Sequence, residues 1–400
     1  MSPSASASRD ALPLLLMSEY FLPQKGGSVT WLANLYQRFA SEGITVLAGG
    51  PDPANGEVVR FPHPIERAPM SMPDRDPTVL ATFGPYRHLY SRTRALARTR
   101  GVRQIHVGKV LPEGWVAYWM RRLHGVPYVL FAHGEEITTG LLSRRLRFVL
   151  PLIYRGAAAV IANSDHTRGI LEGIGVRAER IHVIHPSVPA EDFEGTEERG
   201  RALRERHGLS PDAPVLLTVG RLQRRKGHDV TIQALPSILA RHPEARYVVV
   251  GSGEERDSLG ELARELGVAE HVLFLGAVPD EDLVGWYGAC DLFLMPNRTV
   301  NQDIEGFGIV FLEAAAAGRA AIAGNTGGTR EAVVDGVTGF LVDGAEPAAV
   351  AQVVLRLLDD PALARRLGAA GRERVRRDFS YDRSAARLRE IARNLEGSRG

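Results

Sequence analysis

The chain has 400 residues, 44% of them apolar and 24% charged, which is enough for two ordinary domains with full cores. Its single cysteine, Cys290, excludes a disulfide framework within the chain and fits a reducing, cytoplasmic location. No run of about 18 apolar residues spans a membrane. The opening segment lacks the basic start and apolar core of a signal peptide, so we expect residues 1–11 to form a disordered tail.

The net charge of +2 conceals a difference between the two halves of the chain. Residues 1–190 contain 22 basic and 14 acidic side chains, a surplus of +8, and the remainder of the chain carries −6. A basic first half predicts contact with an anionic partner or surface. We expect no nucleic acid among the partners.

The first half begins with a nearly continuous apolar run over 12–20, which is typical of a strand buried in a parallel sheet. A glycine-rich turn with Gly26 and Gly27 follows, and Ser28 is the expected N-cap of an amphipathic helix. The next strand covers 44–48. This βαβ unit places the glycines where open α/β sheets bind ligands, although glycines alone indicate a tight turn.

Basic residues dominate the stretch 84–122, which contains nine Lys or Arg residues and one acid, Glu113. Arg92, Arg94 and Arg98 fall within two turns of a predicted helix, so at least two could face the same surface. They form either an ordinary solvated face or a contact for an anionic membrane surface or lipid headgroup. A second basic group beside an apolar run points the same way: Arg144, Arg145 and Arg147.

A buried strand over 126–132 delivers His133 to its carboxyl end. Taken alone, a histidine at a strand end is more often structural than catalytic. The next strand covers 157–162, and Ser164 after it is the expected N-cap of a helix.

The second half opens with a strand over 214–219 and a cationic loop bracketed by Gly220 and Gly227. Within this loop Arg221 and Lys226 suit a diphosphate, because arginine offers a bidentate fork and lysine a mobile point charge. The loop lies at a strand end and before a helix. We therefore predict a diphosphate-binding loop.

Three further loops leave strand ends in this half. The strand over 247–250 runs into Gly251, where the residues that follow do not complete a dinucleotide fingerprint and therefore disfavour a NAD site. A later strand leads to Val278. The loop 324–328, with three glycines, is expected to face the same crevice.

The stretch 303–313 is predicted to be a loop that runs into a buried helix. Gly306 and Gly308 leave backbone N–H groups at the mouth of this helix, where unpaired donors and the macrodipole favour a phosphate. Glu305 stands just before the mouth, and Glu313 lies on the helix among apolar residues. A buried carboxylate needs a partner. Glu313 therefore either pairs with an arginine or serves a ligand.

Two glutamates separated by seven residues, with Gly-Phe-Gly between them, resemble the signature of family four of the retaining glycosyltransferases. The resemblance implies that Glu305 contacts the donor sugar and its phosphate and that Glu313 binds the ribose. It also implies that Arg221 and Lys226 hold the diphosphate and that His133 reaches the sugar and the reaction centre. The other implied donor contacts are Gly26, Gly27, Gly251, Val278, Gly306, Phe307, Gly308, Ile309 and Val310.

The longer run 298–313 is most similar to the branch of phosphatidylinositol mannosyltransferases, which use GDP-mannose. The implied α/β fold is GT-B, with two doubly wound Rossmann-like domains facing across a cleft. We expect an acceptor-side domain at 12–190, a linker at 191–200 and a nucleotide-sugar-binding domain at 201–379. A helix over 380–395 would return to complete the first domain.

The implied reaction is retaining transfer of a hexosyl unit, with mannose from GDP-mannose favoured, to a hydroxyl of a lipid-linked or glycan acceptor. The catalytic candidates are His133 and Glu305. No cofactor and no metal are expected, because the site lacks an Asp-x-Asp dyad. The alternatives are a UDP-sugar-dependent transferase acting on a small soluble acceptor, a nucleotide-sugar epimerase and a non-catalytic binding module. We expect a cytoplasmic protein that is peripheral on the inner face of the cell membrane.

Overall fold

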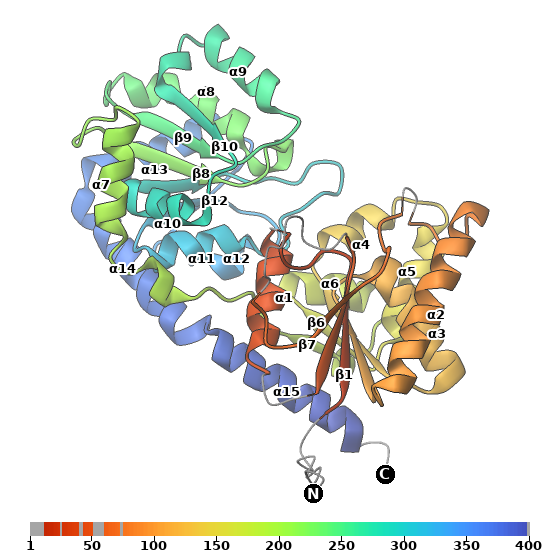
Figure 1. Ribbon diagram of the computed structural model, residues 1–400. Helices are drawn as coiled ribbons and strands as arrows, with labels where there is room; N and C mark the ends of the chain where they lie inside the picture. The colour runs from red at the N-terminus through yellow and green to blue at the C-terminus, as the bar shows by residue number, and fades with distance from the viewer. Residues whose placement is uncertain (1–11, 25, 40–42, 51–59, 73–74, 398–400) are drawn as a thin grey trace, which may run out of the picture. The chain divides into compact units, whose positions relative to one another are not determined.

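The computed structural model describes residues 12–24, 26–39, 43–50, 60–72 and 75–397. The tail predicted for 1–11 lies outside the described residues. Contacts divide the chain into two units, residues 1–185 with 381–400 and residues 186–380. Each unit contains one parallel sheet between layers of helices (Figure 1).

A seven-stranded parallel sheet forms the centre of the first unit. Its strand order is β3-β2-β1-β4-β5-β6-β7, so the order reverses between β1 and β4. Most of these strands are buried along their whole length, as expected for a sheet covered on both faces. The strands are β1 (Leu14–Ser18), β2 (Ile44–Ala48), β3 (Ile65–Arg67), β4 (Gln104–Val107), β5 (Tyr128–Ala132), β6 (Ala159–Ala162) and β7 (Ile181–Val183).

Helices cover both faces of this sheet. On one face α2, α3 and α5 share a buried apolar cluster with alternate strand residues, and on the other face α1 and α15 do the same. The helices are α1 (Gly27–Gln37), α2 (Phe83–Thr99), α3 (Trp115–His124), α4 (Glu135–Gly140), α5 (Leu146–Gly156), α6 (Asp165–Gly173) and α15 (Tyr381–Gly397).

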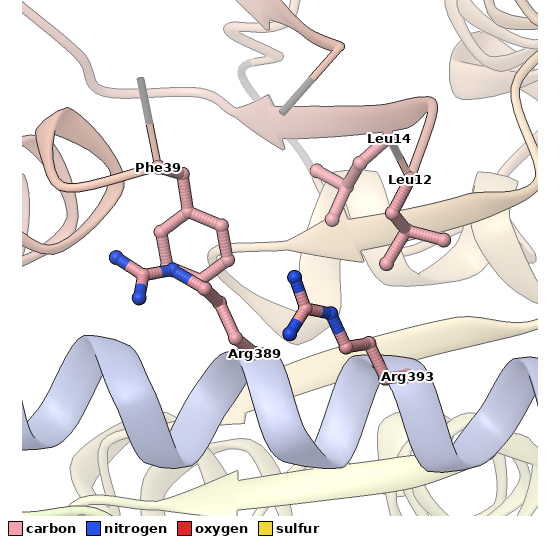
Figure 2. Close-up of a pocket in the computed structure, with 5 residues that line it drawn as sticks. All are labelled: Leu12, Leu14, Phe39, Arg389 and Arg393. Atoms are coloured by element: carbon pink, nitrogen blue, oxygen red, sulfur yellow. The ribbon is translucent and has the colours of Figure 1, made fainter. Parts of the chain in front are cut away.

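Helix α15 is the last helix of the chain and packs in the first unit. The side chain of Gln104 in β4 donates to the carbonyl of Ala392 at 3.2 Å. The guanidinium of Arg389 lies over the ring of Phe39, 4.9 Å from its centroid. Figure 2 shows Arg389 and Arg393 projecting from α15 beside a small hollow. The end of the chain therefore completes the core of the unit that contains its beginning.

The two predicted N-caps differ in outcome. Helix α1 has Gly26 as its N-cap and no side-chain cap, so the prediction for Ser28 is wrong. The helix starts earlier because the Gly26 carbonyl already accepts the N–H of Thr30 at 2.9 Å, which places Ser28 inside the first turn. The prediction for α6 is confirmed, since Ser164 Oγ accepts the N–H of Thr167 at 3.0 Å.

The second unit contains a six-stranded parallel sheet. The order is β10-β9-β8-β11-β12-β13, and it reverses between β8 and β11. The strands are β8 (Val215–Val219), β9 (Arg246–Val250), β10 (Val272–Gly276), β11 (Leu292–Met295), β12 (Ala320–Gly324) and β13 (Gly339–Val342).

Helices also cover both faces of the second sheet. One buried cluster contains α7, α10 and α11, and the other contains α8, α9 and α13, while α14 contributes to both. The helices are α7 (Thr196–Arg206), α8 (His228–Leu239), α9 (Arg256–Glu265), α10 (Asp280–Ala289), α11 (Ile309–Ala316), α12 (Thr329–Ala332), α13 (Pro347–Asp359) and α14 (Pro361–Asp378).

The stretch 191–200, expected to be a linker, contains a helical turn and the start of α7. A Cβ on Gly200 would lie 2.5 Å from the backbone nitrogen of Ala289 in α10. On the other side of the crossing, a Cβ on Gly288 would lie 2.2 Å from a carbonyl oxygen of α7. Glycine at these two positions allows two helices to approach closely. In the sequence alone, a glycine that serves close helix packing looks the same as a glycine in a flexible linker.

Candidate active site

The candidate residues of the second unit meet at the carboxyl edge of its sheet. The loops after β8, β9, β10 and β11 all leave from this edge, and the strand order reverses between β8 and β11. Open α/β sheets bind ligands at such a reversal, because the loops on either side run to opposite faces and leave a crevice between them.

The cationic loop follows β8. Gly227 has φ 78°, and a Cβ there would lie 2.1 Å from the carbonyl oxygen of Pro296, so only glycine fits this approach to the end of β11. Arg221 is exposed, whereas the side chain of Lys226 is 11% exposed. A Cβ on Gly220 would lie 3.8 Å from Lys226 Cε. Lys226 therefore crosses back over the start of its own loop.

Glu305 and Lys226 form the central ion pair of the site. Lys226 Nζ donates to Glu305 Oε2 at 2.5 Å, and Arg225 Nη1 donates to the same oxygen at 2.6 Å. Burial alone would raise the pKa of Glu305, but Lys226 and Arg225 outweigh it and lower the pKa to about 2. Glu305 is therefore ionised at neutral pH.

Arg225 is a site residue that the sequence does not single out. Its side chain is 4% exposed and contacts Asp303 Oδ1 through Nε at 3.0 Å in addition to Glu305. Its own carbonyl accepts the N–H of Arg298 at 2.8 Å. Arg225 is one of three consecutive cations. The only feature of the local sequence that could have identified it as a site residue is its position next to Lys226.

The mouth of α11 is shaped by one glycine and one aromatic residue. Gly308 has φ 87°, and a Cβ there would lie 2.6 Å from the ring of Phe311. Phe307 is buried and packs against the ring of Phe379, the residue directly after α14. Ile309 and Val310 open the helix and are half-buried. Their N–H groups lie at the positive end of the helix, where an anion is stabilised.

Two glycines after β12 hold the backbone around Glu305. The N–H of Gly328 donates to the carbonyl of Glu305 at 3.0 Å. A Cβ on Gly327 would lie 2.2 Å from that oxygen, and one on Gly328 would lie 2.0 Å from the carbonyl oxygen of Gly306. Contact this close between main chains admits only glycine. This loop therefore fixes the main chain that positions Glu305.

Glu313 of α11 is bonded to a tyrosine of α10. Tyr287 Oη donates to Glu313 Oε2 at 2.5 Å. Burial raises the pKa of Glu313, and the hydrogen bond from Tyr287 opposes the rise. Burial and the nearby carboxylate raise the pKa of Tyr287 well above its usual value, so its hydroxyl keeps its proton. The described partner of this carboxylate is a tyrosine, which the sequence analysis does not single out.

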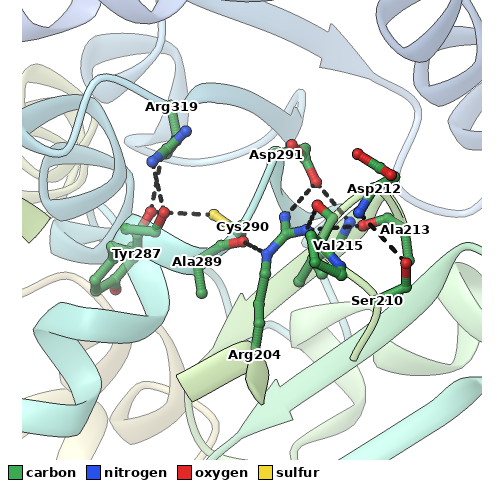
Figure 3. Close-up of polar contacts among 12 residues, drawn as sticks. Arg204, Ser210, Asp212, Ala213, Val215, Tyr287, Ala289, Cys290, Asp291 and Arg319 are labelled. Carbon is green, nitrogen blue, oxygen red and sulfur yellow. Dashed lines mark hydrogen bonds and ion pairs between the residues drawn. The ribbon is translucent and has the colours of Figure 1, made fainter. Parts of the chain in front are cut away.

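One arginine of α7 and one that directly precedes β12 fix the carboxyl end of α10 (Figure 3). Arg319 donates to the carbonyl of Tyr287 at 3.0 Å and to that of Gly288 at 2.6 Å. Arg204 of α7 donates to the carbonyl of Ala289 at 2.8 Å. The main chain of Tyr287 is therefore held independently of its contact with Glu313.

Gly251 and Val278 lie in the neighbouring loops of the same edge. The N–H of Gly251 donates to the carbonyl of Gly276 at 2.8 Å, and a Cβ on Gly251 would lie 2.0 Å from the carbonyl oxygen of Gly220. Val278 is half-buried and packs on the cluster beneath α10 and α11. Gly251 thus keeps the cationic loop close to the end of β9.

His133 belongs to the first unit and lies at the end of β5. Its Nε2 lies 3.0 Å from the carbonyl oxygen of Gly108, which requires Nε2 to carry the proton. The ring of Trp31 in α1 packs edge-on at 5.8 Å. Gly26 and Gly27 begin that helix and are exposed. In this unit the structure therefore links the predicted histidine to the helix that follows the predicted glycines.

The arginines predicted to face a membrane lie on α2. Arg92 pairs with Glu66 of β3 at 2.6 Å, and Arg100 shares that carboxylate at 3.3 Å. Arg94 and Arg98 are exposed. Across the described part of the chain, no helix is both long and apolar enough to cross a membrane.

Two family descriptions match the two halves of the chain. Residues 25–192 match Glycosyltransferase Family 4, and residues 201–374 match Glycosyl transferases group 1. These matches confirm the resemblance inferred from the spacing of Glu305 and Glu313.

Named relatives match over nearly the whole chain. The GDP-mannose-dependent alpha-(1-6)-phosphatidylinositol monomannoside mannosyltransferase of Mycolicibacterium smegmatis is 32% identical, over 94% of this chain and 97% of the relative. The protein of the same name from Mycobacterium tuberculosis is 33% identical, over 96% and 99%. The D-inositol 3-phosphate glycosyltransferase 1 of Catenulispora acidiphila is 31% identical, over 95% and 94%.

Solved structures share the fold at lower identity. Sucrose-phosphate synthase from Thermosynechococcus elongatus has a TM-score of 0.82 at 24% identity, over 96% of this chain and 99% of that chain. HepE from Anabaena, in complex with UDP and glucose, has a TM-score of 0.81 at 21% identity, over 95% and 98%. These likenesses confirm the predicted GT-B fold. The chain therefore belongs to glycosyltransferase family 4 and has the two Rossmann-like domains of GT-B enzymes.

Proposed function

We propose that this protein transfers a mannosyl unit from GDP-mannose to a hydroxyl of a lipid-linked or glycan acceptor, with retention of configuration and without a metal. The main support for this proposal is that the cationic loop, the mouth of α11 and both glutamates converge at one sheet edge. There Lys226 Nζ donates to Glu305 Oε2 at 2.5 Å. The relatives named as GDP-mannose-dependent mannosyltransferases support the choice of donor.

In this proposal the donor diphosphate lies among Arg221, Lys226 and the mouth of α11. Lys226 exchanges part of its pairing with Glu305 for a phosphate oxygen, while Arg225 keeps Glu305 in place. Glu305 then accepts from the sugar hydroxyls, and Glu313 accepts from the ribose. The base lies against the loop that contains Val278.

The reaction breaks the bond between the anomeric carbon and the diphosphate oxygen and forms a bond to the acceptor oxygen on the same face. Negative charge develops on the leaving phosphate, where Arg221, Lys226 and the helix mouth stabilise it. The acceptor proton passes to the leaving phosphate. Neither glutamate is proposed as a nucleophile, because two cations hold Glu305 and Tyr287 holds Glu313. His133 contacts the sugar from the first domain.

A second candidate is a transferase that acts on a small soluble acceptor, with a UDP-sugar as the possible donor. The relative named for D-inositol 3-phosphate favours such an acceptor. The lipid-linked acceptor would instead place the protein at the inner face of the cell membrane, as a peripheral protein.

The proposal can be tested by incubating the purified protein with one of two donors, GDP-mannose or a UDP-sugar. Each donor is combined with a phosphatidylinositol mannoside, with an inositol phosphate or with no acceptor. We expect GDP and a new mannoside from the first donor and the lipid acceptor. The product should keep the anomeric configuration of the donor, and a chelator should not slow the reaction. Product from the UDP-sugar alone, or from the inositol phosphate alone, would select the second candidate. An isomerised sugar nucleotide would indicate an epimerase, and binding without turnover a binding module.

A further inference from the structure

The loop after β11 forms a short hairpin before it reaches Glu305. The N–H of Val300 donates to the carbonyl of Asp303 at 3.0 Å, and the N–H of Asp303 donates to the carbonyl of Val300 at 2.8 Å. These two bonds close a hairpin whose two-residue tip is Asn301 and Gln302. The tip therefore lies in the segment that joins a strand at the reversal of the sheet order to the proposed sugar-binding glutamate.

Both residues of the tip have a left-handed backbone, since Asn301 has φ 49° and Gln302 has φ 67°. Positive φ at both positions is the requirement of a type I′ hairpin turn, where glycine is preferred at the second position. Asparagine tolerates this conformation, but glutamine is strained in it. At every other position with positive φ in the described part of the chain, the residue is glycine. Strained residues of this kind are typical of functional sites, which suggests that the tip keeps its residues for their side chains.

Arg225 joins the stem of the hairpin to Glu305. Its Nε contacts Asp303 Oδ1 at 3.0 Å, and its Nη1 donates to Glu305 Oε2 at 2.6 Å. The carbonyl of Arg225 accepts the N–H of Arg298, which precedes the hairpin, at 2.8 Å. Arg298 in turn forms a bidentate pair with Asp229 of α8, at 2.9 and 2.6 Å. The hairpin is thus fixed both to the cationic loop and to the helix that follows that loop.

The side chains of Asn301 and Gln302 are exposed and have no hydrogen-bond partner among the residues that the structure describes. A side-chain amide offers an acceptor oxygen and a nitrogen with two donors, so it matches sugar hydroxyls, each of which both donates and accepts. Gln302 lies three residues before Glu305, so their Cα atoms are at most about 11 Å apart. The tip therefore presents two amides near the carboxylate that is proposed to accept from the sugar.

We propose that Asn301 and Gln302 bind hydroxyl groups of the transferred hexose and determine which sugar the enzyme accepts. This inference rests on the proposed function and names the residues that recognise the sugar of its donor. Because Arg225 and Arg298 hold the stem, the amides are ordered before the donor binds, which lowers the entropic cost of binding. A site built to hydrogen-bond a hydroxyl discriminates against a sugar that lacks or misplaces it. The turn therefore selects the sugar, whereas the cationic loop binds the diphosphate.

Gln302→Gly tests the proposal, because it removes the amide and relieves the backbone strain together. The variant should unfold about 2–4 °C above the unchanged protein. Its affinity for GDP-mannose should be about three- to tenfold weaker, since a hydrogen bond is lost, while its affinity for GDP should not change. The preference for GDP-mannose over GDP-glucose should also decrease. Titration calorimetry with the three ligands and thermal unfolding of the free protein measure these quantities.

The matched control makes the opposite exchange in another turn of the same unit. Gly336 lies in an exposed turn just before β13, has φ 69°, and a Cβ there would meet nothing within 4 Å. Gly336→Gln should therefore lower the unfolding temperature and leave the affinities for all three ligands unchanged. This control separates the effect of backbone strain from the loss of a ligand contact.

The affinity for GDP distinguishes a lost sugar contact from a displaced Glu305. Displacement of Glu305 would release Lys226 and so change the binding of GDP itself. An unchanged affinity for GDP-mannose in Gln302→Gly, an equal loss for GDP and GDP-mannose, or a lower unfolding temperature would overturn the proposal. If the unchanged protein binds UDP and its sugars in place of GDP, the proposed donor is wrong. The same comparison between a UDP-sugar and UDP then decides the role of the turn.

Discussion

Tyr287 Oη donates a 2.5 Å hydrogen bond to Glu313 Oε2, which joins α10 to the helix that carries the proposed ribose contact. One carboxylate oxygen is thereby fixed, and Oε1 remains to accept from ribose hydroxyls. The ring of Tyr287 packs against Phe193 and Phe293, each with its centroid 5.7 Å away. Tyr287 therefore influences both the position and the ionisation of Glu313.

Tyr287→Phe should make nucleotide binding more sensitive to acid. Burial raises the pKa of Glu313 and the tyrosine bond opposes the rise, so removal of the hydroxyl raises that pKa further. The ionised carboxylate is the better acceptor. As the pH is lowered, the affinity for GDP should therefore begin to decline at a higher pH in the variant than in the unchanged protein. Under alkaline conditions the two proteins should bind GDP equally. Titration calorimetry across the pH range measures this. Tyr247→Phe, which removes a buried hydroxyl bonded to Thr218, is the matched control and should leave the profile unchanged.

Glu313→Gln should fold and bind GDP more weakly, by about 1.5–3 kcal/mol, because hydrogen bonds to a charged group are lost. The loss should disappear when the ligand is a 2′,3′-dideoxy nucleoside diphosphate, which lacks the ribose hydroxyls. Equal affinity for GDP in the folded variant would remove the ribose assignment.

Arg225 and Lys226 bind the same oxygen of Glu305 but should respond differently to substitution. Lys226→Ala leaves Arg225 to pair with Glu305, so we expect a stable fold and a weaker affinity for GDP. Arg225→Ala removes a buried cation between Asp303 and Glu305, and breaking a buried pair costs about 3–5 kcal/mol. Thermal unfolding with and without GDP separates the two effects, with exposed Arg224→Ala as control. A large stability loss in Lys226→Ala with none in Arg225→Ala would reverse the roles.

His133→Ala should lower the rate of transfer and spare the affinity for GDP. The side chain is held at the end of β5 by the carbonyl of Gly108, on the domain proposed to meet the sugar. His124→Ala, at the exposed end of α3, is a suitable control. Steady-state kinetics and GDP titration measure the two quantities. A weaker GDP affinity with an unchanged rate would move His133 to the nucleotide end of the donor.

The sequence predicts those parts of the site that depend on local chemistry. The glycines at 220–227 and 306–308 identify loops, because close backbone approach and positive φ are properties of single residues. Cations between glycines at a strand end predict a phosphate loop for a similarly local reason. Apolar runs likewise predict the buried parallel strands of both sheets.

Pairings between distant segments are beyond such reasoning. Arg225 lies 80 residues from Glu305, and Tyr287 lies 26 residues from Glu313. Nothing in the local sequence tells which of the three consecutive cations, Arg224, Arg225 and Lys226, is buried. Similarly, Tyr287 within an apolar helix looks like an ordinary core residue. The same limit applies on α2, where the sequence does not reveal that Glu66 offsets Arg92.

Glu113 joins the ends of two strands in the first unit. Its Oε1 accepts the N–H of Glu19, which follows β1, at 2.5 Å. Burial raises the pKa of Glu113 to about 7, and burial also raises the pKa of Glu19 against the opposing charges of Arg75 and Lys109. Burial therefore makes both carboxyl groups harder to ionise in the folded protein than in the unfolded chain.

Glu113→Gln should gain stability relative to the unchanged protein as pH rises from about 4.5 through 7. The folded protein holds the proton up to about pH 7 and the unfolded chain only up to about 4.5, so the contribution of Glu113 is complete below 4.5 and lost as pH rises through 7. That difference corresponds to about 3 kcal/mol as an upper bound. Glutamine cannot ionise, and its amide oxygen still accepts the N–H of Glu19. Buried histidines with a lowered pKa, among them His106 and His228, add a pH dependence of opposite sign that all three proteins share. Urea unfolding over this pH range should therefore show that the free energy of unfolding of Glu113→Gln minus that of the unchanged protein increases with pH, whereas the same difference for exposed Glu172→Gln stays constant. A difference between Glu113→Gln and the unchanged protein that does not change with pH would assign the titration to a group other than Glu113.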